Sequence, residues 1–351
     1  MKSKTQVIKE LHWQSHWNIK KLQGILGRFR GKKIAVVGDV GIDRYTIGSV
    51  ERISPEAPVP IVCVTEEKLK LGLAANVADN IQALTGVPYL LGVVGQDREA
   101  DDFRDLLKKS RIKSSFLIED GSRRTVLKER VVSDRQQLVR IDYESPHRID
   151  GKIEKQILKL FQKMISSVDA VIVEDYRKGL FTDVTDAMDS MLSDIFQIAQ
   201  NAGKWVAVDP HLQARAVSYR GATILTPNTK EAEALAGRSI SDSASLAKVG
   251  FDLLKATGAA HLVITRGKEG MALFSRENPV VRLIPTYARE VYDVSGAGDT
   301  VIAVLLLALV AGATLEEAAI LGNLAAGIEV GKRGTATVTC QEIDAALRAI
   351  F

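Results

Sequence analysis

From residue 33 onward, short apolar runs alternate with stretches of helical periodicity, and this alternation restricts the folds open to the chain. The runs with the length of buried strands are 34–37, 170–173, 205–208 and 262–265. The helical stretches between them include 74–84, 153–166 and 186–200. Apolar runs of this kind suit parallel strands covered on both faces, and helices supply the crossovers that such strands need. The sequence therefore predicts an α/β fold with a central, mostly parallel sheet flanked by helices.

Two segments depart from this alternation. Residues 45–69 are rich in Val, Ile and Pro, and residues 125–143 alternate apolar and polar side chains around a polar turn. Alternation with a period of two predicts antiparallel strands. We expect these strands to form a small sheet, or lid, over the carboxyl ends of the parallel strands, where open α/β sheets bind ligands.

Residues 1–30 are expected to form an amphipathic helical extension that docks on one domain, residues 31–351. The apolar positions of this extension are Leu11, Ile19, Leu22 and Leu26. His12 and His16 are four residues apart, the spacing of two metal ligands on a helix, but no third ligand lies nearby in the sequence. Docking without a metal is the alternative.

Composition excludes several classes of function. The chain has 47 Lys and Arg against 43 Asp and Glu, and a net charge of +4 is too balanced to indicate a nucleic-acid-binding protein. The longest apolar run, 301–311, is far shorter than the roughly 20 residues that cross a bilayer, and the N-terminus lacks a secretory signal. The two cysteines, Cys63 and Cys340, fit a reducing compartment. We therefore expect a cytoplasmic protein with no nucleic-acid or membrane partner.

The strongest local signal is the segment 293–300, DVSGAGDT, which leads into an apolar helical stretch. Gly296, Ala297 and Gly298 would place backbone N–H groups at a helix N-terminus, where phosphate binds readily. Asp299 would lie in the first turn, close enough to accept a proton from a hydroxyl group that attacks a phosphoryl group. The alternative is a plain helix N-cap with glycines for close packing.

A second signal is NTKE, which follows a predicted strand and comprises Asn228, Thr229, Lys230 and Glu231. Asn228 and Glu231 are three residues apart, so on a helix they point the same way and suit a hydrated Mg²⁺ bound to ATP phosphates. The alternative is a capping box, in which the two residues satisfy each other's backbone N–H groups.

Weaker signals complete the candidate site. Asp39 and Asp43 follow the first strand and could accept hydrogen bonds from sugar hydroxyls, together with Gly72 and Asn76 at the start of the next helix. Turn and cap chemistry is the alternative for this group. The positions that could border a nucleotide are Thr265, Gly267, Asn323 and the loop 331–335. Ordinary packing is the alternative there.

Taken together, GAGD before an apolar helix, NxxE after a middle strand and the Gly-Asp pair after the first strand resemble the ribokinase (PfkB) family of carbohydrate kinases. The resemblance runs from about Ile34 to the C-terminus. Within the family, the segments 51–60 (ERISPEAPVP), 175–179 (DYRKG) and 290–300 (EVYDVSGAGDT) are most similar to the heptose 7-phosphate kinases.

The resemblance implies a ribokinase-like sheet whose β-lid also forms a homodimer contact, with ATP and Mg²⁺ as cofactors. It implies phosphorylation of the anomeric hydroxyl of D-glycero-D-manno-heptose 7-phosphate to the 1,7-bisphosphate, toward the ADP-heptose of the lipopolysaccharide core. Asp299 would be the base, 296–298 the anion hole and 228–231 the ATP and magnesium segment, while Asp43 and Asn76 would hold the sugar. No His-x-Gly-His motif is present, so a separate nucleotidyltransferase would act on the product.

The 7-phosphate of such a substrate needs cations. The basic residues in or beside the lid segments are Arg52, Arg123, Lys128 and Arg130. Arginine suits bidentate contacts with phosphate, although exposed strands also carry basic residues for solubility.

The chain departs from the family pattern at two positions near these sites. Leu73 stands where the family has a glycine, and its side chain would crowd a backbone that should approach the sugar. His211 stands where the family tends to have lysine, which would remove one cation at neutral pH. A kinase of another sugar or sugar phosphate is therefore the first alternative, and a non-catalytic sugar-phosphate sensor is the second.

Overall fold

A computed structural model of the chain describes residues 7–11, 17–133, 136–181, 190–288, 290–332 and 334–350. Within these ranges the main sheet has the strand order β1-β14-β13-β12-β11-β10-β9-β2-β5-β6. Its strands are β1 (Val7–Glu10), β2 (Lys33–Gly38), β5 (Val87–Val94), β6 (Leu117–Glu119), β9 (Ala170–Glu174), β10 (Trp205–Asp209), β11 (Ile224–Leu225), β12 (His261–Thr265), β13 (Met271–Ser275) and β14 (Asn278–Ile284). Pairing is parallel except on the two sides of β13. The predicted mostly parallel sheet is confirmed.

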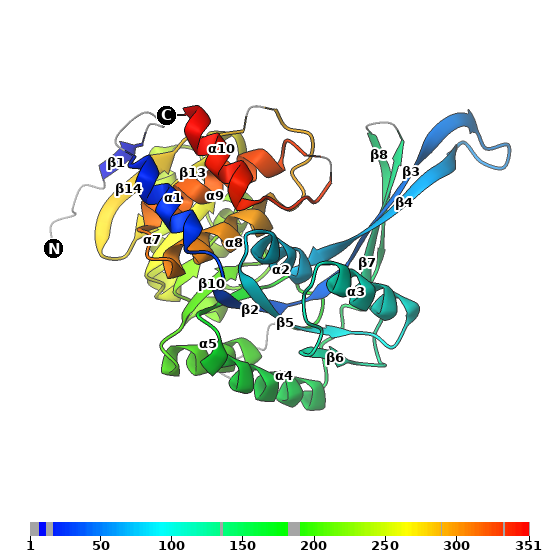
Figure 1. Cartoon of the computed structure of the whole chain (residues 1–351), viewed down its shortest axis with the longest axis horizontal. Coiled ribbons are helices and arrows are strands. Elements are labelled where there is room, and N and C mark those ends of the chain that lie inside the picture. Colours follow the sequence, from blue (N-terminus) through cyan, green and yellow to red (C-terminus); the bar gives the residue numbers. More distant parts are fainter. Residues whose placement is uncertain are drawn as a thin grey trace.

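Helices cover both faces of this sheet (Figure 1). One face packs against α1 (Ile19–Gly27), α2 (Ala74–Ala83), α3 (Arg98–Lys109), α8 (Ala297–Val310), α9 (Leu315–Glu329) and α10 (Cys340–Ile350). The other face packs against α4 (Gly151–Met164), α5 (Met191–Asn201), α6 (Thr229–Ala236) and α7 (Ser243–Thr257). No helix in the described ranges is both long and apolar enough to cross a membrane.

The second sheet projects from the body as the predicted lid (Figure 1). Its strands are β3 (Val40–Ile53), β4 (Pro60–Leu73), β7 (Val126–Ser133) and β8 (Gln136–Tyr143), in the order β4-β3-β7-β8. The hairpins β3–β4 and β7–β8 are antiparallel as expected, but β3 and β7 pair in parallel, which the sequence analysis did not foresee. Both strands leave the body at the carboxyl edge of the main sheet, so they run outward in the same direction.

The N-terminal segment differs from the predicted continuous helix. Val7–Glu10 forms β1, which pairs in parallel with β14 at the edge of the main sheet, and only Ile19–Gly27 is helical. Pairing with an open sheet edge outweighs the helical periodicity of this segment. His12 and His16 lie outside the described residues. Because Leu22, Ile25 and Phe29 are buried in the core, this segment is an integral part of the domain.

A fully buried carboxyl group lies at the end of α9. Glu329 Oε1 accepts the backbone N–H of Ala336 at 3.5 Å, and Oε2 has no hydrogen-bond partner among the described residues. Burial, followed by the neighbouring Asp299 and Asp293 carboxylates, raises the pKa of Glu329 from its ordinary 4.5 to about 8. The native state therefore holds a proton here at neutral pH.

We expect Leu22→Ala to lower the free energy of unfolding by about 2 to 5 kcal/mol, because Leu22 is 1% exposed and its removal leaves a cavity beneath α1. Urea unfolding followed by circular dichroism measures this loss. Lys20→Ala, an exposed change on the same helix, is the control and should leave the midpoint unchanged. Equal stability of the two variants would show that the segment is only a loose extension.

We also expect the stability of the wild-type protein to fall as the pH rises from about 4.5 to about 8, because the unfolded chain releases the Glu329 proton that the native state retains. Glu329→Gln removes this contribution, so its unfolding free energy should decline less over the same range. Urea titrations at about pH 5 and about pH 8 measure the difference. Glu67→Gln, an exposed change in the lid, should follow the wild type; identical slopes for all three proteins would contradict the assignment.

Candidate functional site

The start of α8 brings an anion-binding backbone and a carboxylate together, as the GAGD motif predicts. Gly296 is the N-cap residue with φ of +95°, and an added Cβ would lie 3.0 Å from Asn76 Nδ2, so a side chain does not fit there. Asp299 is in the first turn and is 9% exposed. Its Oδ2 accepts a hydrogen bond from Asn76 Nδ2 at 2.6 Å, and its Oδ1 accepts one from the Tyr176 hydroxyl at 2.7 Å.

Burial raises the pKa of Asp299 to about 6, although the hydrogen bonds from Asn76 and Tyr176 favour its ionised form. A carboxylate of this pKa is ionised at neutral pH and is a stronger base than an exposed aspartate. Tyr176 was not among the predicted site residues. It lies in the DYRKG segment, which the sequence analysis used only for family resemblance.

Two further acidic residues lie beside Asp299. Glu174, Asp209 and Asp299 each have a carboxylate oxygen within 4.8 Å of the other two. Glu174 is fully buried, and neither of its carboxylate oxygens has a hydrogen-bond partner among the described residues. Burial, followed by the neighbouring carboxylates, raises the pKa of Glu174 and Asp209 well above ordinary values. Unpartnered buried oxygens grouped in this way are suited to a divalent cation.

Sequence reasoning missed Glu174 and Asp209, although a signal for both was present. Glu174 is the last residue of β9 and Asp209 the last residue of β10, and the two are register partners in adjacent parallel strands. Acidic residues at the carboxyl ends of neighbouring strands lie at the edge where α/β folds place their sites.

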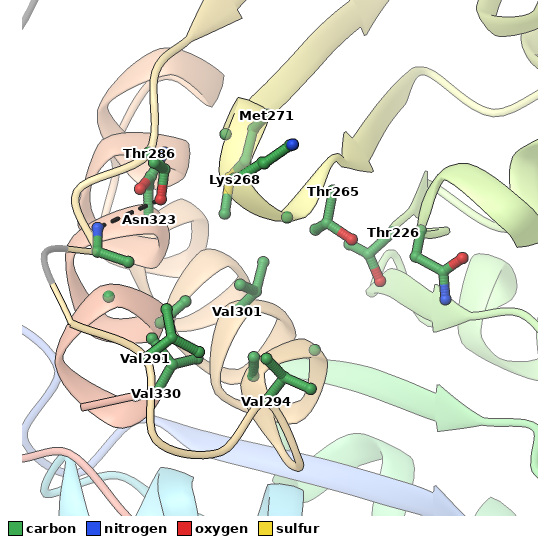
Figure 2. A pocket seen from close by; sticks show the side chains of 18 of the residues that line it. Thr226, Thr265, Lys268, Met271, Thr286, Val291, Val294, Val301, Asn323 and Val330 are labelled. Atoms are coloured by element: carbon green, nitrogen blue, oxygen red, sulfur yellow. Dashed lines mark hydrogen bonds between the residues drawn. The ribbon is translucent and has the colours of Figure 1, made fainter. Parts of the chain in front are cut away.

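A cavity of about 460 Å³ opens beside the acidic cluster (Figure 2). Predicted site residues that line it are Asn228, Glu231, Thr265, Gly267, Ala297, Gly298 and Asn323. Asp209 and Thr226 also line it, together with apolar residues such as Val291, Val294 and Val330. A cavity with a largely apolar wall, polar groups and a helix N-terminus suits a nucleotide.

The NTKE segment forms the capping box that was the alternative prediction. Asn228 Oδ1 accepts the N–H of Glu231 at 3.0 Å, and Glu231 Oε2 accepts the N–H of Asn228 at 2.7 Å. Both residues also line the cavity, so the capping box leaves them in reach of a ligand there. The remaining two residues of the segment do not line it: Thr229 bonds the carbonyl of Thr265 at 3.4 Å, and Lys230 is exposed.

Asn323 and Asp39 have structural partners. The Asn323 amide group bonds the backbone of Tyr287 and Pro285, each at 3.0 Å, so this residue holds the cavity wall in place. Asp39, predicted to bind sugar hydroxyls, accepts the backbone N–H groups of Lys178 and Leu180 at 2.9 and 3.1 Å. Its two oxygens support the segment after β9, and the structure does not bring them into the cavity.

Other predicted sugar residues gather at the base of the lid. Asp43 is 5% exposed and pairs with Arg130 at 2.5 Å. Gly72 lies opposite, where an added Cβ would be 3.1 Å from the Asp43 carboxyl, so a larger residue would push this carboxyl aside. The Lys128 ammonium group lies 5.8 Å from the centre of the Tyr176 ring. Asp43, Asn76, Lys128 and Asp299 thus belong to one group of interacting side chains.

Two of the basic residues considered for phosphate lie elsewhere. Arg52 is exposed near the outer end of β3, nine residues along the strand from Asp43, a span of roughly 30 Å. Arg123 is buried and bonds internal groups of the protein. The structure brings Lys128 and Arg130, but neither of these two, to the Asp299 side of the lid.

The two departures from the family pattern have visible consequences. Leu73 adopts φ of +57°, a conformation that leucine rarely takes and that glycine takes readily. His211 donates its backbone N–H to the Tyr219 hydroxyl at 2.9 Å, and its Nδ1 accepts the N–H of Gln213 at 3.1 Å. The backbone at position 73 is therefore strained, which was not predicted, and the predicted crowding of the sugar by the Leu73 side chain stays a prediction.

Comparison with known proteins agrees with this geometry. Bifunctional protein HldE from Trichlorobacter lovleyi is 42% identical over 328 residues, which are 93% of this chain and 65% of that protein. Bifunctional protein HldE from Geobacter sulfurreducens is 44% identical over 308 residues, 88% of this chain and 61% of that protein. The chain thus spans less than two thirds of the length of these relatives.

Solved structures share the fold at low sequence identity. Phosphofructokinase-2 from Escherichia coli in complex with potassium superposes with a TM-score of 0.74 at 18% identity, covering 92% of this chain and 99% of that one. Arabidopsis thaliana ribokinase complexed with ribose and ATP gives 0.70 at 17% identity, covering 91% and 99%. The family model for pfkB family carbohydrate kinases matches residues 32–342. With its ribokinase-like sheet, its lid and a match over this range, the chain belongs to the pfkB family of carbohydrate kinases.

Proposed function

We propose that the protein transfers the γ-phosphoryl group of ATP to the anomeric hydroxyl of D-glycero-D-manno-heptose 7-phosphate and forms the 1,7-bisphosphate. The observation that carries the kinase assignment is the position of Asp299, a buried base beside the anion-binding start of α8 and next to the cavity. Support for the heptose comes from the segments 51–60, 175–179 and 290–300 and from similarity to the HldE proteins.

The geometry suggests how the reaction proceeds. ATP occupies the cavity with its γ-phosphate at the backbone N–H groups that begin α8, and the sugar lies between Asp299 and the base of the lid. The sugar oxygen attacks phosphorus as the bond to the ADP oxygen breaks, and Asp299 accepts the hydroxyl proton. The N–H groups stabilise the charge on the phosphoryl oxygens. Lid closure would exclude water that could otherwise take the phosphoryl group.

Magnesium fits the residues beside the cavity. Glu174 and Asp209 would hold the ion, because Glu174 offers two buried oxygens with no partner among the described residues. Asn228 and Glu231, the pair predicted from sequence, line the same cavity and would contact the ion through water. When bound, the ion neutralises phosphate charge and orients the γ-phosphoryl group.

The lid is the proposed homodimer contact. Its exposed apolar side chains are Val50, Ile53, Val59, Val64, Val139 and Ile141, between 37% and 61% exposed. Apolar side chains grouped on a projecting sheet are typical of a surface covered by another molecule. Arg52 lies among these side chains. Within one chain it is too far from Asp43 to take part in the site, so a dimer contact is the role that its position offers.

The substrate experiment compares ADP release from Mg-ATP with the heptose 7-phosphate, the unphosphorylated heptose, fructose 6-phosphate and ribose. We expect preference for the heptose 7-phosphate, and a loss of turnover of about 10²- to 10⁴-fold in Asp299→Asn, which keeps the shape of the side chain but cannot accept the proton. Asp252→Asn, an exposed change on α7, should retain full activity.

Each other outcome identifies a different error in the proposal. Turnover with another sugar only would keep the kinase and reject the heptose, in line with the strain at Leu73. ATP binding without turnover on any sugar would favour the sensor. Full activity of a folded Asp299→Asn protein would remove the base assignment.

For magnesium, we expect Glu174→Gln to raise the Mg²⁺ concentration at half-maximal rate by about tenfold or more, because the neutral amide replaces an anionic ligand. Thermal unfolding gives a second readout, since MgCl₂ should stabilise the wild type more than the variant. Glu154→Gln on α4 is the matched control. The same Mg²⁺ dependence in all three proteins would exclude Glu174 as a ligand.

A further inference from the structure

The segment 175–180, between β9 and the lower face of the lid, has an unusual backbone. Arg177 has φ of +52°, and Gly179 has φ of +109°. An added Cβ at Gly179 would lie 2.2 Å from the carbonyl oxygen of His147, so the glycine is required. A non-glycine residue at positive φ is strained and persists only where surrounding contacts fix the backbone.

Contacts from several elements fix this backbone. Asp39, just beyond β2, accepts the N–H groups of Lys178 and Leu180. Asp175 accepts the N–H of Arg177 at 3.1 Å through Oδ1 and the buried Tyr219 hydroxyl at 2.7 Å through Oδ2. The positive φ of Arg177 is therefore held both by a local bond from Asp175 and by contacts with neighbouring elements.

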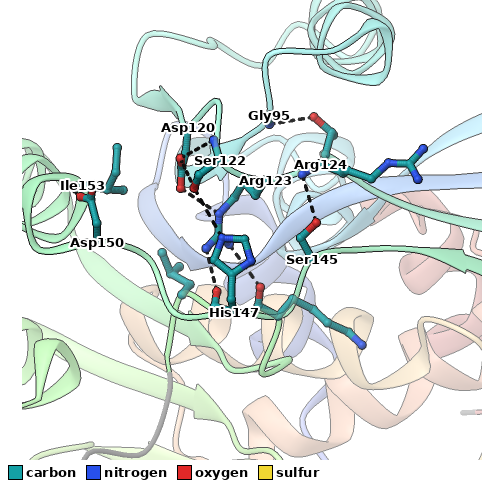
Figure 3. A network of polar contacts seen from close by, with 12 residues as sticks. Gly95, Asp120, Ser122, Arg123, Arg124, Ser145, His147, Asp150 and Ile153 are labelled. Atoms are coloured by element: carbon teal, nitrogen blue, oxygen red, sulfur yellow. Dashed lines mark hydrogen bonds and ion pairs between the residues drawn. The ribbon is translucent and has the colours of Figure 1, made fainter.

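Arg123 provides a further support (Figure 3). Its Nε donates to Asp120 Oδ2 at 3.0 Å, and its two terminal nitrogens donate to the carbonyl oxygens of Lys178 at 3.3 Å and His147 at 2.8 Å. Its side chain is only 6% exposed. The Arg123 guanidinium group therefore joins the loop before β7 to the 175–180 segment. It has little exposed surface with which to bind a substrate phosphate.

The side chain that this segment carries toward the catalytic centre is Tyr176. Its hydroxyl donates to Asp299 Oδ1 at 2.7 Å, while Asn76 donates to Oδ2 at 2.6 Å. Two donors on opposite oxygens fix the rotation of the carboxylate plane, which a single donor does not. Asp299 also lies beside Glu174 and Asp209, so the orientation of its carboxylate sets how close its oxygens come to these two groups.

We propose that Tyr176 is a positioning residue that orients the Asp299 carboxylate toward the attacking hydroxyl, and that Arg123 acts on catalysis by fixing the backbone that carries Tyr176. The proposal rests on the proposed function insofar as Asp299 is the base. Tyr176 acts through Asp299 and needs no contact with substrate. Neither residue was predicted as part of the catalytic machinery.

The first test is Tyr176→Phe, which removes the hydroxyl and keeps the ring. We expect kcat to fall between about 10- and 100-fold, because misorientation of a catalytic group costs this much, with the KM for ATP changed less than about twofold. Tyr89→Phe, on β5, removes a tyrosine hydroxyl elsewhere in the sheet and should leave both constants unchanged. An unchanged kcat in folded Tyr176→Phe would overturn the proposal.

The second test is a double-mutant cycle with Arg123→Lys, which keeps the charge but loses the planar group that bonds three acceptors. If Arg123 acts through Tyr176, Arg123→Lys should lower kcat in the wild-type background and add little to Tyr176→Phe. If the double variant instead loses kcat by the product of the two separate factors, Arg123 supports the fold independently of Tyr176.

A crystal structure of Tyr176→Phe gives a readout that does not depend on turnover. The proposal expects the Asp299 carboxylate to rotate about its bond to the main chain while Asn76 stays in place. An unmoved carboxylate would overturn the proposal even if the protein is the expected kinase. Absence of turnover by the wild type on any sugar, together with a rotated carboxylate in the variant, would instead reject the proposed function and keep the positioning role.

Discussion

The buried position of α8 is the constraint on which the site depends. Residues 299–309 of this helix are all buried, so the packing of the core sets where the first turn lies. β9 and β10 end beside that turn, and because they pair in register, Glu174 and Asp209 arrive at the same level. Three elements thus deliver carboxylates to one point, and each is held by the core. Functional groups on rigid elements keep their geometry better than groups on loops.

Three carboxyl groups in one place, two of them buried, are electrostatically unfavourable, and the structure compensates them unequally. Asp299 has two side-chain donors, and its pKa is raised only to about 6, whereas burial and charge repulsion raise the pKa of Glu174 and Asp209 much further. A divalent cation would favour the ionised forms of the latter pair, so binding it would release protons. In the proposed mechanism the same cluster thus supplies one carboxylate as a base and two groups as ligands of a cation.

Features that depend on local spacing in the sequence were predicted, whereas features that depend on strand register and burial were missed. The parallel sheet, the lid and the GAGD turn follow from periodicity and short motifs, and the structure has all three. Glu174 and Asp209 lie 35 residues apart in the chain and become neighbours only through strand pairing. Arg123 was considered as a phosphate ligand because it lies beside a basic lid segment. The sequence does not reveal that its side chain is buried. Residues 7–10 showed helical periodicity, yet an open sheet edge made them a strand.

The lid is connected to both donors of the Asp299 carboxylate, to one along the chain and to the other through a side-chain contact. β4 ends at Leu73 and leads directly into α2, where Asn76 donates a hydrogen bond to Asp299. Leu73 keeps its positive φ because the next residue, Ala74, donates its N–H to the Asp39 carbonyl at 3.0 Å. β7 carries Lys128 over the ring of Tyr176, the other donor. A displacement of the lid would therefore move the attachments of both donors at once. In the proposed reaction, a sugar that contacts the lid therefore affects Asp299 through these two connections, and its binding is coupled to the orientation of that carboxylate.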